Sequence, residues 1–413
     1  MDALLLTADR VILGPADQPP IERGAVLIDG GRIVRVGPAD AFSNEDRMDL
    51  PGHTLMPGLI DAHVHLALPG DGASFPDFVK EPIGVQMAVA VHNAEAALRA
   101  GITTLKDCGG PHTLTFELRR AGNLGYAQIP RLHLCGRPLT IRGGHCWYFG
   151  GECGGRDGVA EMVREVCKQG ADYVKAMGSG GGTPHTMSWL PAFTPAELAR
   201  MADEAHRLGR RLAVHCLCAE ATLQALAAGV DVIEHCGFIT GADTPQRFDP
   251  RVAEAVAQAG VVVCPTLSVG DTVLPYLRAH AGDSPADRAA CDRWERMFEE
   301  NMANTAHLRA AGVPLISGTD AGWRFTPFDA GAREMELLKE CGLSTAAALA
   351  SGTSGAAGAL GIERETGTLA AGLSADIIAV PGNPLSDMKA LKHPALVMRA
   401  GEVIVGGNEN HGK

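Results

Sequence analysis

The middle of the chain, from about residue 57 to about residue 365, alternates helical segments with short apolar runs. Amphipathic segments at 85–100, 158–169, 194–208, 219–228, 251–259 and 304–311 precede apolar runs at 103–107, 173–177, 212–215, 232–235, 261–264 and 315–320. One helix start is explicit, because Thr194 and Glu197 form a capping-box pattern around Pro195. Repeated units of this kind over about 300 residues predict an α/β fold, a (β/α)8 TIM barrel. A doubly wound parallel sheet is the alternative.

The two ends of the chain have a different texture. Short strands separated by turns are predicted at 3–6, 10–13, 24–28, 32–36 and 53–55, and again at 376–380, 395–399 and 402–405. Asp29-Gly30-Gly31 is a hairpin signal between two of them. We therefore predict a small β-sandwich domain built from residues 1–56 plus 366–413, beside a barrel domain of residues 57–365.

Composition limits the partners and the location. The net charge is −12 and no long Lys/Arg cluster offsets it, so neither nucleic acid nor an anionic membrane surface is an expected partner. The 11 cysteines show no regular framework, which argues against disulfide staples. The N-terminal residues lack the basic region of a signal peptide, and no apolar stretch of about 18 residues suggests a membrane span. A cytoplasmic location is the resulting expectation.

The segment His63-Val64-His65 points to chemistry. Side chains two residues apart on a strand face the same side, so both imidazoles would project together. Apolar neighbours suggest a strand that is buried on both faces, as in a parallel sheet. Two such histidines at a strand end make half of a metal site. A bare H-x-H pattern is also compatible with polar residues in a turn.

Other predicted strands end on side chains that can bind a metal, namely Lys175, His215, His235 and Asp320. The carboxyl ends of barrel strands converge on one mouth, so these residues are expected near His63 and His65. Taken singly, a histidine there suits the core and an aspartate suits a helix cap. Lys175 stands in an apolar strand, where it is either a lysine that reaches the barrel rim or an amine that reacts with carbon dioxide to form a carbamate ligand.

The whole pattern resembles the amidohydrolase superfamily, in particular the carboxylated-lysine branch with Xaa-Pro and Xaa-Arg/Lys dipeptidases and ochratoxin-type amidases. The resemblance covers nearly the whole chain. It rests on P-G-L-I-D-A-H-V-H-L at 57–66, G-I-T-T-L-K-D-C-G-G at 101–110, Y-V-K at 173–175, A-V-H at 213–215, I-E-H at 233–235, S-G-T-D-A-G at 317–322 and G-T-L-A-A-G-L-S-A-D-I-I-A-V at 367–380.

This resemblance implies two divalent metal ions, with zinc as the expected metal. One ion would be held by His63, His65 and Asp320, and the second by His215 and His235, with Lys175 carboxylated by carbon dioxide and bridging the pair. A hydroxide between the metals would attack the carbonyl of an amide substrate. Asp320 would carry the proton to the leaving amine. His145 aligns with a G-G-H element that contacts the substrate carbonyl in relatives, although a structural loop histidine is the alternative.

Several further residues have two interpretations. Asp107 is either a partner that fixes a ligand histidine or a helix cap. His185, Trp189 and Phe193 are candidate substrate contacts or loop packing, and Trp147-Tyr148-Phe149 is a stacking surface or a satellite hydrophobic cluster. The glycine-rich run at 178–182 lacks a following G-K-[ST], so we expect it to let the loop clear the metals and not to bind phosphate. Many close relatives have H-x-H-G where this chain has His215-Cys216-Leu217-Cys218, and I-E-H-G where it has Ile233-Glu234-His235-Cys236. A second histidine and two glycines are therefore lost near the mouth, so substrate preference is not transferred from the dipeptidases.

The predicted activity is hydrolysis of an amide bond in a dipeptide or an N-acyl amino acid. Hydrolysis of cyclic amides, carbamates or ureas and deamination of a heterocycle are the alternatives, and Lys175 argues against deamination because deaminase branches lack that ligand. A non-enzymatic scaffold would have lost several ligands, and all six are present. A free substrate carboxylate would need a partner, for which Arg137, Arg142 and Arg324 are available. The expected partners are a small-molecule amide and further copies of the chain in a homo-oligomer.

Overall fold

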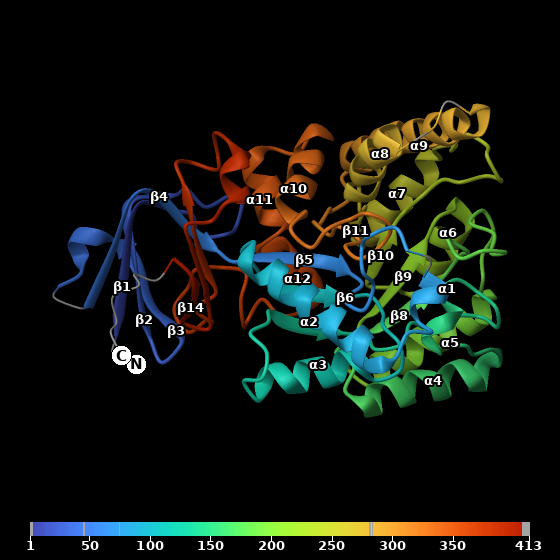
Figure 1. The fold of residues 1–413 in the computed structure, drawn as a ribbon, viewed down its shortest axis with the longest axis horizontal. Coiled ribbons are helices and arrows are strands. Elements are labelled where there is room, and N and C mark those ends of the chain that lie inside the picture. Colours follow the sequence, from blue (N-terminus) through green and yellow to red (C-terminus); the bar gives the residue numbers. More distant parts are fainter. Residues whose placement is uncertain (1–2, 44–45, 74, 281, 283, 407–413) are drawn as a thin grey trace.

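Strands from both ends of the chain form one seven-stranded sheet. The computed structural model describes residues 3–43, 46–73, 75–280, 282 and 284–406. The order is β14 (Glu402–Val405), β13 (Leu396–Arg399), β12 (Ile377–Pro381), β4 (Asp46–Pro57), β1 (Leu4–Val11), β2 (Ile21–Asp29) and β3 (Arg32–Pro38). Figure 1 shows its blue and red strands side by side at one end of the molecule.

This sheet joins the two chain ends through β4, which pairs in parallel with β1 and antiparallel with β12. Strands from both ends of the chain therefore share one sheet. Strand pairing gives a single sheet, so the two-sheet sandwich stays a prediction, as do the domain boundaries. Residues 1–2, 44–45 and 407–413 of the predicted terminal domain lie outside the described residues.

The middle of the chain contains two parallel sheets. One has the order β11 (Val262–Cys264), β10 (Val232–His235), β9 (Leu212–Cys216) and β8 (Val174–Met177), and the other has the order β5 (Leu59–Val64), β6 (Ile102–Asp107) and β7 (Arg131–Leu134). Their strands are buried almost throughout, which explains the continuous apolar runs in the sequence.

Backbone hydrogen bonds connect these two sheets at both sides. Next to β8, Leu139 donates to the Lys175 carbonyl and accepts from Met177. On the other side, the segment 314–321 bonds to β11 and to β5, with Ile316 donating to Val263 and Asp320 donating to His63. The predicted strand at 315–320 is wrong as a regular element, because this segment contributes only isolated bridges at Leu315 and Ala321.

Helices surround the parallel strands. They are α1 (Phe75–Phe78), α2 (Ile83–Arg99), α3 (Leu114–Asn123), α4 (Gly155–Gln169), α5 (Pro195–Arg207), α6 (Ala219–Ala228), α7 (Pro250–Ala259), α8 (Ser268–His280), α9 (Pro285–Ala310), α10 (Gly331–Glu340), α11 (Thr345–Ser351) and α12 (Ser354–Leu360), with short 3-10 turns at Ala39–Ala41, Trp147–Phe149 and Met388–Lys392. The capping box predicted at the start of α5 is present.

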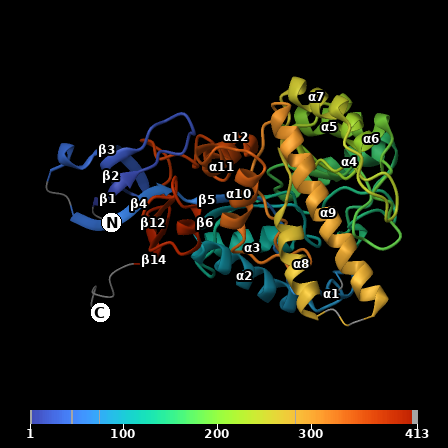
Figure 2. The ribbon, with the colours of Figure 1, turned by 90° about the horizontal axis from the view of Figure 1, so that it is seen from above.

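The longest helix, α9, crosses the outside of the molecule in Figure 2. Only its last two turns carry buried residues (Asn304, Thr305 and Leu308), so the sequence pattern predicted that part alone. None of the helices in the described part of the chain combines the length and the apolar composition of a membrane-crossing segment.

Candidate metal centre and active site

One cavity of about 260 Å³ is lined by the six predicted metal ligands and by His145. His63 lies on β5 and His65 follows it, while Lys175, His215 and His235 lie at the carboxyl ends of β8, β9 and β10. Asp320 comes from the segment that bonds to β5, and His145 comes from the loop before α4. The structure therefore brings these seven side chains together. It does so from segments spread over more than 250 residues, as the carboxyl ends of parallel strands allow.

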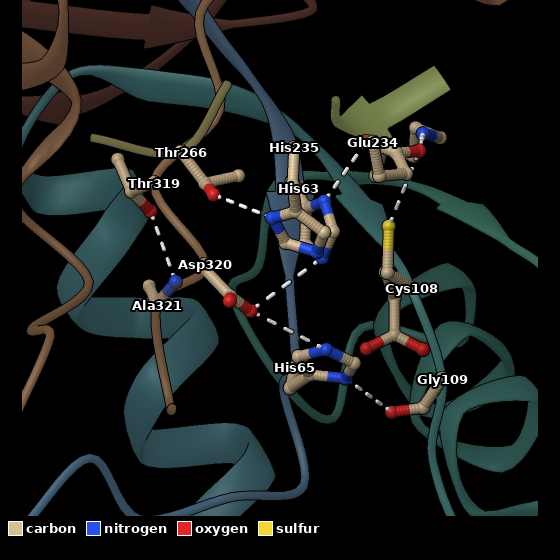
Figure 3. A network of polar contacts seen from close by, with 12 residues as sticks. His63, His65, Cys108, Gly109, Glu234, His235, Thr266, Thr319, Asp320 and Ala321 are labelled. Atoms are coloured by element: carbon tan, nitrogen blue, oxygen red, sulfur yellow. Dashed lines mark hydrogen bonds and ion pairs between the residues drawn. The ribbon is translucent and has the colours of Figure 1, made fainter. Parts of the chain in front are cut away.

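His63, His65 and Asp320 face one another closely enough to share one ion. The Nε2 atoms of His63 and His65 lie 3.5 and 3.4 Å from the same oxygen, Oδ1 of Asp320. Figure 3 shows both imidazoles turned toward this carboxylate. Oδ1 is buried and accepts no hydrogen bond among the described residues. One buried oxygen without a donor, faced by two imidazole nitrogens, is a geometry that a cation would complete.

The opposite nitrogens of three histidines are engaged elsewhere. Nδ1 of His63 donates to Glu234 at 2.9 Å, Nδ1 of His65 donates to the Gly109 carbonyl at 3.0 Å, and Nδ1 of His235 donates to the Thr266 hydroxyl at 2.7 Å (Figure 3). With the proton on Nδ1, Nε2 keeps its lone pair for a ligand in the cavity. His215 has the reverse arrangement, since its Nε2 donates to the Gly180 carbonyl at 3.1 Å and leaves Nδ1 free.

Burial keeps the site imidazoles neutral. It lowers the pKa of His65 to about 4 and that of His145 to about 3, and it lowers the pKa values of His63, His215 and His235 well below their usual range. Burial raises the pKa of Asp320 to about 7, against the attraction of Lys175. Neutral imidazoles are the form that binds metals.

A buried charge network lies beneath the cavity, and sequence reasoning did not single out two of its members. Glu234 accepts from His63, forms a close ion pair with Lys106 and lies 3.7 Å from Nζ of Lys175. Burial opposes the ionisation of Glu234, but Lys106 and Lys175 hold its pKa well below its usual range. The available signal was a charged residue inside an apolar strand, which is the signal that identified Lys175.

Asp61 is a further residue that the sequence analysis did not single out. It accepts from the backbone of His63 at 3.2 Å and of Thr319 at 3.0 Å, and its other oxygen accepts the Thr319 hydroxyl at 2.6 Å. It thereby connects β5 to the segment that carries Asp320.

The backbone is left-handed at two of the proposed ligands, with φ of 59° at Asp320 and 68° at His235 at the end of β10. Non-glycine residues adopt such values mostly where the surrounding structure imposes them, often at functional sites.

The glycine-rich run passes close to two aromatic side chains, and its expected clearance of the metals stays a prediction. A Cβ at Gly181 would lie 2.5 Å from Nε2 of His145, and a Cβ at Gly182 would lie 2.3 Å from the Trp323 indole. Only glycine therefore lets this loop pass so close to both rings. Nδ1 of His145 is held by the Thr183 hydroxyl at 2.8 Å.

Other candidates fall outside the cavity. Phe193 packs in the main core, and neither His185 nor Trp189 lines the cavity, so their predicted role as substrate contacts is not supported. Tyr148 and Phe149 belong to a satellite hydrophobic cluster, which was the second interpretation. Asp107 accepts from the backbone of Leu66 at 3.0 Å, so it fixes the chain after His65 and not the imidazole; the N-cap of α3 is Thr113.

The arginines and cysteines are also placed. Arg324 lines the cavity, whereas Arg142 is exposed on a loop and Arg137 donates to the Gly150 carbonyl. Cys216 is buried and Cys236 is among the residues that line the cavity. All 11 cysteines are free thiols.

Comparison with known proteins identifies the family. The model of the amidohydrolase family matches residues 54–404. The chain belongs to this family. Among individual proteins, this amidohydrolase is 27% identical to ochratoxinase from Aspergillus niger over 438 aligned residues, which cover 94% of this chain and 83% of that protein.

Two further similar proteins have other activities in their names. The amidohydrolase is 28% identical to imidazolonepropionase from Rhizorhabdus wittichii over 402 aligned residues, covering 86% of this chain and 88% of that protein. A solved Xaa-Pro dipeptidase with methionine bound in its active site superposes with a TM-score of 0.86 at 28% identity, over 98% of this chain and 100% of that one. The resemblance stated from the motifs is therefore confirmed, and so is an enzyme that acts on carbon–nitrogen bonds.

Proposed function

We propose that this amidohydrolase uses two divalent metal ions, expected to be zinc, to hydrolyse an amide bond in a small molecule. The observation that carries the proposal is the convergence of six potential ligands on one cavity, with Oδ1 of Asp320 buried and unpartnered between two imidazoles. His63, His65 and Asp320 would hold one ion, His215 and His235 the other, and a carbamate on Lys175 would join them. The family membership supports this assignment.

The same proposal includes a closed (β/α)8 barrel. The hydrogen bonds through Leu139 and through segment 314–321 support it, because they connect the two parallel sheets on both sides. A closed barrel would place every proposed ligand at one mouth.

The bound ions would supply Lewis-acid polarisation and an activated water. The protein's own residues divide the remaining work. Asp320 would accept the proton of the attacking water as the new carbon–oxygen bond forms and would deliver it to the nitrogen as the carbon–nitrogen bond breaks. His145, held by Thr183, would orient the substrate carbonyl.

The substrate class follows from relatives and stays open to test. Similarity to a Xaa-Pro dipeptidase and to ochratoxinase favours a dipeptide or an N-acyl amino acid. Similarity to imidazolonepropionase keeps a cyclic amide as the second candidate. A small-molecule substrate and a homo-oligomeric assembly are part of the proposal.

The test is hydrolysis of a library of dipeptides and N-acyl amino acids by zinc-loaded protein in bicarbonate buffer, with released amine as the readout. We expect chelator-sensitive turnover. The Lys175→Ala variant should lose most of its bound metal, measured by elemental analysis, and its activity. If protein with two metals per chain hydrolyses no member of the library, the search should turn to cyclic amides or carbamates. A fully metallated, active Lys175→Ala variant would refute the bridging carbamate.

A further inference from the structure

Arg324 is the one arginine of the three candidates that lines the cavity. It follows Asp320 by four residues, just after the segment 314–321 that bonds to β5. Its guanidinium carbon lies 5.4 Å from the ring centre of Trp323 and 5.8 Å from that of Trp294 on α9. Two indoles therefore fix the position of the guanidinium from two directions. The Trp323 ring also lies 6.2 Å from the ring of His145, so this one indole is near both Arg324 and a proposed catalytic group.

The guanidinium has no acidic partner. Its Nε atom is buried and makes no hydrogen bond in the described part of the chain, and no described carboxylate pairs with it. Burial lowers the pKa of Arg324, with only the Tyr148 hydroxyl acting in the other direction. Removing a charge from water without a partner is costly. The Arg324 side chain is half-buried and only its Nε is fully enclosed, so the other donors of the guanidinium remain available to a ligand that carries a negative charge.

The cavity differs in charge from the protein as a whole. The chain carries a net charge of −12, but the lysine, arginine and acidic side chains that line the cavity are Lys175, Arg324 and Asp320. Lys175 faces Glu234, and Asp320 faces His63 and His65. The positive charge of Arg324 alone is unmatched. A planar guanidinium with free donors is suited to bidentate binding of a carboxylate.

We propose that Arg324 binds a carboxylate of the substrate, so that the enzyme selects anionic amides such as N-acyl amino acids and dipeptides over neutral amides. This inference rests on the proposed function, because it deepens the assignment of the same cavity. It assigns Arg324 as a specificity residue that contacts the substrate and takes no part in proton transfer.

The first test measures binding and needs no turnover. The probes are 3-phenylpropanoic acid, which has a carboxylate but no amide bond to hydrolyse, and its neutral carboxamide, titrated calorimetrically into zinc-loaded protein. Wild-type protein should bind the acid at least about 10-fold more tightly than the carboxamide, and Arg324→Gln should weaken the acid by about 10- to 100-fold without changing the carboxamide. Arg324→Lys should restore part of the loss, because it keeps the charge but not the fork. Arg142→Gln, an exposed arginine outside the cavity, is the matched control.

Thermal melting separates this role from a structural one. Arg324→Gln should lower the melting temperature only slightly, because the variant loses the contacts with Trp294 and Trp323 but no hydrogen bond or ion pair in the described chain. If the preference for the acid survives Arg324→Gln, the carboxylate is held by the metal ions and the inference is wrong. Equal weakening of both probes would also overturn it. If Arg324→Gln does not fold, Arg324→Lys provides the same comparison.

Turnover then distinguishes the two proposals. Hydrolysis of neutral amides as fast as of anionic ones would overturn the role of Arg324 and leave the amidohydrolase activity standing. If the protein prefers the acid in an Arg324-dependent way but hydrolyses no amide, the role of Arg324 stands and the amidohydrolase activity is refuted. In active protein, Arg324→Gln should raise KM for anionic substrates far more than it changes kcat.

Discussion

At the scale of single residues, Glu234 connects the charges beneath the cavity. It is fully buried and contacts His63, Lys106 and Lys175. Its carboxylate fixes the tautomer of one proposed ligand and compensates two buried ammonium groups. Such a residue determines the geometry of the site without lining it.

The Glu234→Gln variant should therefore be strongly destabilised. In metal-free protein, in which Lys175 is not carboxylated, the amide has the same shape but leaves Lys106 and Lys175 without a counter-charge, a situation that typically costs about 3–5 kcal/mol. Denaturant unfolding measures the loss. Adding Lys106→Met to Glu234→Gln should recover part of the lost stability, because it removes one of the two unpaired charges. If Glu234→Gln alone is as stable as wild type, the charge of Glu234 does not stabilise the fold.

Asp320→Asn tests the proposed proton carrier. An amide neither accepts nor delivers the proton, so kcat should fall by about 100- to 10,000-fold, while binding of a product-like acid should change much less. Steady-state kinetics and calorimetry give the two quantities. The exposed Asp329→Asn is the control. Unchanged turnover in Asp320→Asn would remove Asp320 from proton transfer.

The residues that sequence reasoning identified share a local signal. His63, His65, Lys175, His215 and Asp320 each interrupt or end an apolar run, and the cavity brings them together. Lys106 and Glu234 carry the same signal but pair across 128 positions, so their partnership becomes visible only when the strands are placed side by side. Arg324 is a candidate because no described carboxylate lies close enough to pair with its guanidinium. Such a missing partner is a property of the folded structure, and no local sequence pattern predicts it.

At the scale of elements, helices α4 and α5 pack through a carboxylate. Glu204 on α5 is buried, with 1% of its side chain exposed, and meets Arg164 of α4 at 2.8 Å as well as Arg200 and Arg207 of its own helix. Hydrogen bonds from Arg207 and Arg164 lower the pKa of Glu204 to about 2. A carboxyl whose folded pKa lies below its unfolded value stabilises the fold above the unfolded pKa, and the effect disappears as the pH falls through the folded pKa.

The stability difference between wild type and Glu204→Gln should follow that rule. Near neutral pH the variant should be less stable by about 1–3 kcal/mol, since it loses hydrogen bonds to charged groups. Between about pH 4.5 and about pH 2 the difference should shrink, so melts at about pH 7 and about pH 3.5 suffice for the comparison. The exposed Glu161→Gln on α4 should show no such dependence. A difference independent of pH would exclude the charge of Glu204 as its source.

Elements with one buried face were predictable and others were not. The predictions for α5, α6 and α7 succeed because a buried stripe alternates with polar positions. The first part of α9 has no buried residue in the described chain and gave no such signal. Segment 314–321 has the composition of a strand, but its left-handed turn at Asp320 prevents a regular ladder.

At the scale of the whole molecule, metal binding should be linked to global stability. The proposed ligands come from β5, β8, β9, β10 and the segment at Asp320, so their geometry exists only in the folded chain. An ion at 100 times its dissociation constant adds about 2.7 kcal/mol. Chelator should lower the melting temperature, and zinc with bicarbonate should restore it, whereas magnesium should not, because it prefers oxygen ligands. Identical melts with and without chelator would argue against the metal centre.

The pairing of β4 has a consequence for synthesis of the chain. β4 runs through Gly58 into β5, the strand of His63, and one edge of β4 is covered by β12 at Ile377–Pro381. All the proposed ligands precede β12 in the sequence, so a nascent chain would hold every one of them while the strand that leads to the first histidines still had an open edge. During synthesis, all the proposed metal ligands would thus leave the ribosome before β12, the strand that covers the edge of β4. The metal site should therefore form in one late step, after the last strands have been synthesised.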